Sequence, residues 1–300
     1  MKGGAAQLTC GCKINLFLRI GGRLDSGYHE LRSLMLPLAE PFDRITIDAA
    51  DKEGGADLTV RFHPLAEPEK DLKDIDRKNN TLNRAYHWFK ERTAFAPRLL
   101  VNVYKGIAHG AGLGGGSADA AVFLSFLHTQ AVREGRLPEQ DLSADEDFIR
   151  ASAAIGADVP FFLLEAPAQV FGIGEKLLAC PNPVVGFFLV LVCPAIFIST
   201  AWAFRALDLK RGGAEFPALP GREDAAALLR LGNDFEDVVY GHYPELGAIR
   251  DALLDYGAQA ARLSGSGSAI FGIFPEENRA RAASEDLARR GYSVYRQQLP

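Results

Sequence analysis

The sequence predicts an α+β protein of two domains, residues 1–165 and residues 166–300. With 300 residues and 48% hydrophobic content, the chain can bury a large core and exceeds the usual size of one domain. Its beginning alternates apolar and polar residues as strands do, and its end runs as a β-α-β-β-α-β-like series. Such a series is typical of a ferredoxin-like domain, which we expect at the C-terminus.

Strands dominate the N-terminal part. The run Leu8–Ile20 alternates, with Lys13 and Asn15 on one face and apolar residues on the other. A lysine that begins a strand is usually just solvated. A turn-rich loop then places Tyr28 and His29 at its exit, where such a pair more often packs than recognises a ligand. Further strands are expected over Leu31–Leu38, Phe42–Asp48 and Ala56–Phe62, with a hairpin at Gly54-Gly55 joining the last two.

Helical patterns follow. A charged surface loop over Glu67–Asn79 leads to a helix capped at Asn79 or Asn80 and ending near Arg92. Its Leu82, Ala85, Tyr86 and Phe89 share one face. A strand over Leu99–Tyr104 and a helix over Ala118–His128 come next, and then an amphipathic helix over Ala144–Ile155 that Gly156 ends.

A glycine-rich stretch separates that strand from the helix after it. It comprises Gly110, Gly112, Leu113, Gly114, Gly115, Gly116 and Ser117. Glycines allow positive φ and let backbone N–H groups converge on an anion at the start of a helix, so a phosphate is the simplest ligand. A chain reversal alone would need only two glycines.

Spacing separates the known phosphate loops. A Walker A loop needs a lysine directly after its last glycine, but Ser117 follows Gly116. The pattern Gly110-x-Gly112-x-x-Gly115 fits a dinucleotide fingerprint, which also requires an acidic residue at the end of a second strand. Glu134 lies at about the right distance, but in a polar helix exit.

Two further motifs carry polar groups. Asp158 lies in the apolar heptapeptide Gly156–Phe162, where it could serve as a base or merely cap a helix. The Ser-Gly run Ser264–Ser268 lies between a helix and a strong strand, which favours a tight second anion-facing loop over a flexible linker. The apolar run Phe187–Cys193 suits a buried central strand, and short helices are expected up to Leu231.

Charge and cysteines limit the class of protein. A net charge of −5 without a basic block argues against nucleic acid as the main partner. The four cysteines show neither CxxC spacing nor a neighbouring histidine at ligand spacing, so we expect reduced thiols. No apolar run approaches the length of a membrane span and the N-terminus lacks a signal sequence, so we expect a cytoplasmic protein without a membrane partner. The sequence assigns no oligomeric state.

These motifs together resemble the GHMP kinase superfamily, ATP-dependent kinases of small molecules. The stretch Gly112-Leu-Gly-Gly-Gly-Ser117 is similar to the superfamily's phosphate loop. Tyr28-His29 and Gly156-Ala-Asp-Val-Pro160 are similar to the members that act on a cytidine diphosphate-linked methylerythritol. The other matching motifs are Lys13-Ile-Asn-Leu-Phe-Leu18 and Ser264-Gly-Ser-Gly-Ser268, so the resemblance covers nearly the whole chain.

The resemblance implies two α+β domains with a deep cleft between them, and ATP and Mg²⁺ as cofactors. Asp158 would be the general base and Lys13 its electrostatic partner, and the two would meet as a charge pair. Gly110 and Gly112–Ser117 would bind the ATP phosphates, with Ser117 as a candidate metal ligand. The substrate would be held by Asn15, Tyr28, His29, Phe204, Ser264, Gly265, Ser266 and Gly267, with Tyr28 and Phe204 on the two sides of the cytosine.

Departures from the pattern leave alternatives open. Asp119 stands where the family often has an asparagine, which adds a negative charge near the phosphates. Another GHMP small-molecule kinase, a ligand sensor on the same fold and a dinucleotide-binding oxidoreductase are the competing hypotheses.

Overall fold

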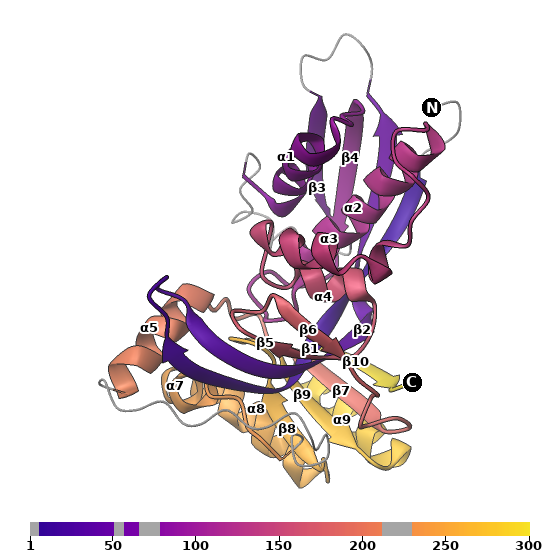
Figure 1. Ribbon diagram of the computed structural model, residues 1–300. Helices are drawn as coiled ribbons and strands as arrows, with labels where there is room; N and C mark the ends of the chain where they lie inside the picture. The colour runs from indigo at the N-terminus through magenta and orange to yellow at the C-terminus, as the bar shows by residue number, and fades with distance from the viewer. Residues whose placement is uncertain (1–5, 51–56, 66–78, 212–229) are drawn as a thin grey trace. The chain divides into compact units, whose positions relative to one another are not determined.

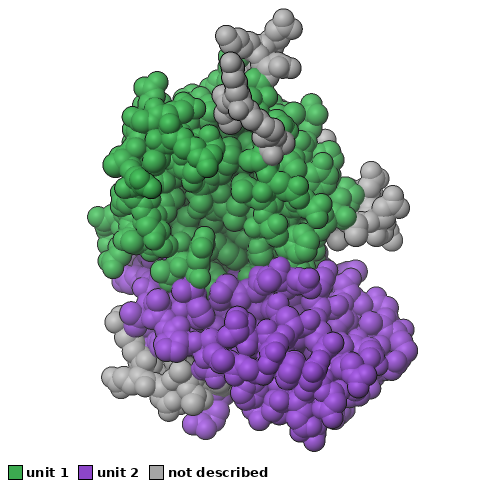
Figure 2. All heavy atoms as spheres, turned by 90° about the vertical axis from the view of Figure 1, so that its right-hand side faces the viewer, with its two compact units in different colours: residues 1–12, 41–109, 114–165 green, residues 13–40, 110–113, 166–300 purple. Residues whose placement is uncertain are grey.

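The computed structural model describes residues 6–50, 57–65, 79–211 and 230–300. The chain forms two compact units, coloured separately in Figure 2: unit 1 takes residues 1–12, 41–109 and 114–165, and unit 2 takes residues 13–40, 110–113 and 166–300. The glycine stretch is therefore divided between the units. The prediction of domains at 1–165 and 166–300 is a division along the chain, whereas residues 13–40 and 110–113 pack with the later part.

The sheet of unit 1 has the strand order β3-β4-β2. The elements are β2 (His29–Ala49), which also contributes to unit 2, β3 (Leu58–Pro64) and β4 (Leu99–Lys105). Strand β2 is continuous where the sequence predicts two strands. The predicted hairpin between β2 and β3 is wrong, because β4 lies between them, antiparallel to β2 and parallel to β3. Leu99, Val101 and Val103 of β4 are fully buried and suit an interior strand, whereas Thr59 and Arg61 of β3 are exposed.

Helices α1 (Thr81–Thr93) and α2 (Gly115–Arg133) lie side by side over one face of these strands (Figure 1). The predicted cap of α1 is confirmed, because the Asn80 side chain accepts a hydrogen bond from the backbone N–H of Asn83. Its predicted apolar face is buried.

The predicted helix over Ala144–Ile155 is shorter than expected. It consists of α3 (Glu146–Ala151) between two 3₁₀ turns, because Asp145 caps the backbone N–H of Phe148 and starts the helix later. Helix α4 (Val159–Leu164) follows and carries Asp158 at its N-terminus.

Unit 2 contains a four-stranded antiparallel sheet in the order β10-β7-β9-β8. The strands are β7 (Phe188–Cys193), β8 (Ala260–Leu263), β9 (Ile270–Phe274) and β10 (Ser293–Gln298). Helices α8 (Pro244–Asp255) and α9 (Glu277–Arg289) pack on it. This order confirms the predicted ferredoxin-like set, with β7 as the expected buried interior strand.

The remaining elements of unit 2 frame the candidate site. Strand β1 (Ala6–Arg23) pairs with β2, and β2 also pairs with β5 (Ala168–Phe171), which pairs with β6 (Lys176–Ala179). Helices α5 (Thr200–Arg211) and α7 (Glu236–His242) contact each other. The Gly54-Gly55 turn, nearly all of the loop over 67–79 and most of the short helices up to Leu231 fall outside the described residues.

The described part of the chain contains all four cysteines. None of the four cysteines forms a disulfide within these residues, and Cys10, Cys12 and Cys193 are buried. Within the same ranges, no helix combines the length and the apolar content that crossing a bilayer requires.

Candidate active site

The glycine stretch begins helix α2 earlier than the sequence predicts. Gly114 is the N-cap, with a positive φ of 75°, and its carbonyl oxygen accepts hydrogen bonds from the backbone N–H groups of Ser117 and Ala118. The first N–H groups of a helix have no partner within it, and the helix dipole is positive at the same end. Gly115–Ser117 therefore form the kind of helix start at which phosphates bind.

The topology around α2 excludes the dinucleotide alternative. A dinucleotide-binding unit needs α2 to lead into a strand parallel and adjacent to β4. In this chain α2 leads into α3 and α4, and the next strand, β5, pairs antiparallel with β2.

Within unit 2, the first glycines contact the Ser-Gly loop at backbone distance. Gly112 has φ +74°, and a Cβ atom there would lie 2.0 Å from the carbonyl oxygen of Ser264. The Ser264 hydroxyl donates a 3.1 Å hydrogen bond to the carbonyl oxygen of Gly112, and the N–H of Ala269 donates to the carbonyl oxygen of Ala111. The structure thus brings the first glycines of the glycine stretch together with the Ser-Gly loop. The two backbones approach so closely that position 112 must be a glycine.

Lys13 is buried beside these loops, with 3% of its surface exposed, and so is not the solvated strand lysine that its position suggests. Its ammonium group donates to Asn15 Oδ1 at 2.6 Å and to the carbonyl oxygen of Gly112 at 2.8 Å. Asn15 Nδ2 donates in turn to the hydroxyl of Ser33, which donates to the carbonyl oxygen of Phe17. The chain of hydrogen bonds holds a cation against the glycine loop.

Asp158 lies in unit 1, close to the start of α2. A Cβ atom at Gly114 would be 3.3 Å from Asp158 Oδ2, and one at Gly156 would be 3.1 Å from the hydroxyl oxygen of Ser117. Asp158 precedes α4 but makes no side-chain cap hydrogen bond, which argues against capping as its purpose. Its pairing with Lys13 stays a prediction.

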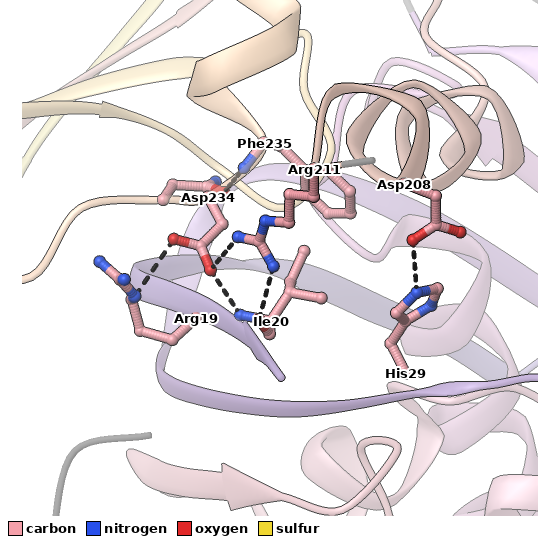
Figure 3. Close-up of polar contacts among 8 residues, drawn as sticks. Arg19, Ile20, His29, Asp208, Arg211, Asp234 and Phe235 are labelled. Carbon is pink, nitrogen blue, oxygen red and sulfur yellow. Dashed lines mark hydrogen bonds and ion pairs between the residues drawn. The ribbon is translucent and has the colours of Figure 1, made fainter. Parts of the chain in front are cut away.

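His29 and Phe204 stack, whereas Tyr28 is exposed. The rings of His29 and Phe204 are 5.0 Å apart between centroids and 13° from parallel, and His29 is buried. His29 Nε2 lies 2.8 Å from Asp208 Oδ1 (Figure 3). Tyr28 keeps 62% of its surface exposed, so its ring is accessible to a ligand. The cytosine sandwich between Tyr28 and Phe204 stays a prediction.

The hydroxyls of the Ser-Gly loop bond within the protein. Besides the Ser264 hydrogen bond, the Ser266 hydroxyl lies 2.9 Å from the Thr200 hydroxyl, and Ser268 donates to the carbonyl oxygen of Ile196. Asn233, which sequence reasoning did not single out, donates from Nδ2 to the carbonyl oxygens of Leu263 and Gly265. The sequence feature that could have identified Asn233 is its position in Gly232-Asn233-Asp234, just before a helix, where asparagine side chains often bond to the backbone.

Sequence reasoning also missed a buried charge cluster in unit 1. Lys105, the last residue of β4, pairs with Asp43 and, at 2.9 Å, with Asp119 on α2. Asp43 Oδ1 accepts hydrogen bonds from the backbone N–H groups of Gly106 and Ile107, which lead into the glycine stretch. Both carboxylates are buried, and Lys105 is the cation that both of them contact within unit 1.

Burial dominates the titration of this cluster. It raises the pKa of Asp119 to about 7, since the attraction of Lys105 does not offset desolvation and the repulsion of Asp43. Burial also raises the pKa of the Cys10 thiol, and the Asp119 charge adds to this effect. Desolvation by itself would lower the pKa of Lys105, but Asp119 and Asp43 together raise it. Oδ1 of Asp119 is buried without a hydrogen-bond partner among the described residues.

Comparison with known proteins places these features in a family. Residues 80–166 match the GHMP kinases N terminal domain, and residues 216–293 match the GHMP kinases C terminal model. A crystal structure of a 4-(cytidine 5'-diphospho)-2C-methyl-D-erythritol kinase has a TM-score of 0.71 and 29% identity, covering 97% of this chain and 98% of that one. A homoserine kinase from Cytophaga hutchinsonii, at 14% identity and a TM-score of 0.70, shares the fold alone.

Curated relatives match over nearly the full length. The 4-diphosphocytidyl-2-C-methyl-D-erythritol kinase of Nitratidesulfovibrio vulgaris strain Hildenborough is 41% identical, covering 98% of this chain and 99% of its own. The kinase of the same name from Solidesulfovibrio magneticus is 39% identical over 95% of this chain and 93% of its own. These matches agree with the glycine-rich start of α2 and with its contact to the Ser-Gly loop: the chain is an ATP-dependent small-molecule kinase of the GHMP fold and belongs to the 4-diphosphocytidyl-2-C-methyl-D-erythritol kinase family.

Proposed function

We propose that this chain transfers the γ-phosphoryl group of ATP to the 2-hydroxyl of 4-diphosphocytidyl-2-C-methyl-D-erythritol, in non-mevalonate isoprenoid precursor synthesis. The names of its full-length relatives support this substrate. The observation that carries the chemistry is the buried ammonium group of Lys13, 2.8 Å from the carbonyl oxygen of Gly112. A fixed cation beside a phosphate loop suits the stabilisation of a phosphoryl group in transfer.

Asp158 is the general base in this proposal. Its carboxylate takes the proton of the tertiary hydroxyl, the hydroxyl oxygen forms a bond to the γ-phosphorus, and the bond to the β,γ-bridging oxygen breaks to release ADP. Lys13 stabilises the charge that develops on the oxygens. The supporting observations are the position of Asp158 beside Gly114 and its lack of a capping hydrogen bond.

The ATP phosphates lie along Gly110 and Gly112–Ser117 in the proposal, with Leu113 contributing its backbone and not its buried side chain. Mg²⁺ would supply positive charge that neutralises the phosphates. The described residues contain no grouping of three or more His, Cys, Asp or Glu side chains that could hold a metal. Mg²⁺ bound through phosphates needs only one or two protein ligands, and the hydroxyl of Ser117 at the start of α2 fits that need.

The substrate side is assigned to unit 2. Tyr28 and Phe204 stack on the two sides of cytosine, and His29, on whose ring Phe204 also stacks, bonds the edge of the base. Asn15 and the loop Ser264, Gly265, Ser266 and Gly267 hold the diphosphate and methylerythritol portions. For the loop, backbone groups are the natural contacts, because its serine hydroxyls bond within the protein.

The test is a phosphoryl-acceptor panel. The protein is incubated with ATP and Mg²⁺ and, separately, 4-diphosphocytidyl-2-C-methyl-D-erythritol, free methylerythritol, homoserine or mevalonate, and ADP is measured by a coupled assay. Rapid ADP release is expected with the cytidine-linked acceptor alone. A faster rate with homoserine or mevalonate would identify another GHMP kinase activity. A rate of ADP release that is the same with and without every acceptor would reject the proposal.

A further inference from the structure

One face of helix α5 carries three side chains directed at the strands that bear the candidate substrate site. Phe204, Asp208 and Arg211 are spaced as i, i+4 and i+7, which places them on one side of a helix. Phe204 stacks on His29, and Asp208 Oδ1 lies 2.8 Å from His29 Nε2. One helix therefore controls both the plane and the edge of the His29 ring.

The last residue of this helix is tied to strand β1. Arg211 donates to the carbonyl oxygen of Ile20 at 2.8 Å and pairs with Asp234 Oδ2 at 2.9 Å. Asp234 also pairs with Arg19 and accepts a 2.7 Å hydrogen bond from the backbone N–H of Ile20 (Figure 3). Asp234 is buried, so the loss of Arg211 would leave a poorly compensated charge. The network fixes α5 against β1, and with it the position of Asp208.

The contact between Asp208 and His29 has a chemical consequence. An ionised carboxylate only accepts hydrogen bonds, so the proton in this contact belongs to Nε2. In the neutral imidazole the lone pair then lies on Nδ1. The His29 ring is buried and stacked on Phe204, so the protein and not bulk water sets its orientation.

We propose that Asp208 is a positioning residue for base recognition, holding His29 in the tautomer that carries its proton on Nε2 and presents Nδ1 as an acceptor. This inference rests on the proposed function. An acceptor favours the 4-amino group of cytosine and disfavours the 4-carbonyl oxygen of uracil, so Asp208 contributes to the choice of a cytidine-linked substrate.

Calorimetry with CDP, UDP and ATP tests the effect on recognition. In Asp208→Asn the amide can either accept from Nε2 or donate to it, so position 208 no longer fixes the imidazole tautomer. We expect CDP affinity to fall about tenfold, since such a hydrogen bond contributes ~1.4 kcal/mol, and the CDP-to-UDP preference to narrow while ATP affinity stays unchanged. Asp208→Glu keeps the carboxylate and should retain part of the preference. The matched control is Asp251→Asn, an exposed aspartate paired with Arg250 in the same unit.

Long-range ¹H–¹⁵N NMR of the His29 ring in the ligand-free protein gives a readout that does not depend on binding. We expect a protonated Nε2 in the unmodified chain and a shift of protonation toward Nδ1 in Asp208→Asn. A proton on Nδ1 in the unmodified chain, or an unchanged CDP affinity and preference in Asp208→Asn, would overturn this inference and leave the proposed function standing. Failure of the unmodified chain to bind CDP would overturn both.

Discussion

The ammonium group of Lys13 donates a 2.8 Å hydrogen bond to the carbonyl oxygen of Gly112, 99 positions later in the chain. The backbone N–H of Lys13 also donates to the carbonyl oxygen of Leu113. Lys13 thus holds the glycine loop through both its backbone and its side chain. Because Lys13 shapes the loop besides its proposed catalytic role, its substitution tests two properties, which the measurements must separate.

Replacement of Asp158 by asparagine tests the general base. Asp158 is half-buried and makes no side-chain cap hydrogen bond, so Asp158→Asn should keep the fold. We expect turnover to fall by about 10² to 10⁴, the usual contribution of a general base, with nearly unchanged binding of ATP and substrate. Single-turnover rates and calorimetry measure the two effects. Asp147→Asn, on the exposed surface of α3, is the control, and retained turnover in Asp158→Asn would reject the role.

Lys13→Met should also lower turnover, and a double variant tests whether Lys13 and Asp158 act on one transition state. If they do, Lys13→Met/Asp158→Asn should be barely slower than the slower single variant. Lys13→Met leaves the carbonyl oxygen of Gly112 and Asn15 Oδ1 without their cation, at a cost of about 1 to 3 kcal/mol in folding free energy. Urea unfolding measures that cost separately. Additive losses in turnover would mean that the two residues act independently.

Tyr28→Ala tests stacking on the base. Because the Tyr28 ring is exposed, its loss should leave folding unchanged. We expect substrate binding to weaken by about 1 to 3 kcal/mol with little change in ATP affinity. Leu24→Ala removes another exposed apolar side chain from the same turn and should change neither affinity. Equal losses for both ligands in Tyr28→Ala would contradict the assignment.

Gly116→Ala probes the phosphate cradle with little strain. A Cβ atom at Gly115 would lie 2.9 Å from Ile107, so substitution there disturbs packing, whereas at Gly116 the nearest atom is Thr81 Oγ1 at 3.4 Å. Gly116 lies in α2, where alanine favours the helix by up to about 1 kcal/mol. We therefore expect intact or higher stability and a rise in the KM for ATP of about tenfold or more.

Gly241→Ala serves as the control for that experiment. Gly241 lies in α7, and a Cβ atom there meets nothing within 4 Å. It should gain stability without a change in the KM for ATP. A normal KM in Gly116→Ala would show that the phosphates do not approach this part of the helix start.

The pH dependence of the stability of Asp119→Asn tests the buried charge cluster. Burial raises the pKa of Asp119 to about 7 in the folded protein, from its ordinary value of 3.8. Between these values the folded state holds a proton that the unfolded state has released, so the Asp119 contribution to stability falls as pH rises. Asp119→Asn should therefore become more stable relative to the unmodified chain from about pH 4 to about pH 7, by at most ~1.4 kcal/mol per pH unit.

Urea unfolding of both proteins at several pH values measures this difference. The exposed Asp147→Asn variant should show no such trend. A stability difference between Asp119→Asn and the unmodified chain that stays constant across this range would mean that Asp119 remains ionised when folded.

The local features of the site could be predicted from the sequence. The strand before the glycines, the helix after them, the Asn80 cap and the ferredoxin-like end each follow from periodicity and from capping or turn residues within a short window. These signals act through backbone preferences of neighbouring residues, which a sequence displays directly. The family resemblance, carried by short motifs in chain order, was confirmed by full-length relatives.

The tertiary structure decided which distant groups meet. Strand β4 lies between β2 and β3 because its valines are buried on an interior strand. The turn residues between β2 and β3 predict a hairpin but contain no information about this burial. The contacts of Lys105 with Asp43 and Asp119, and of His29 with Asp208, join segments far apart in the chain and form only when the elements pack. The type of a residue gives its charge, but the packing of the elements decides which residue compensates that charge. The sequence therefore determined the elements and the family, whereas packing determined the contact of His29 with Asp208, the buried ion pairs and the surroundings of Lys13.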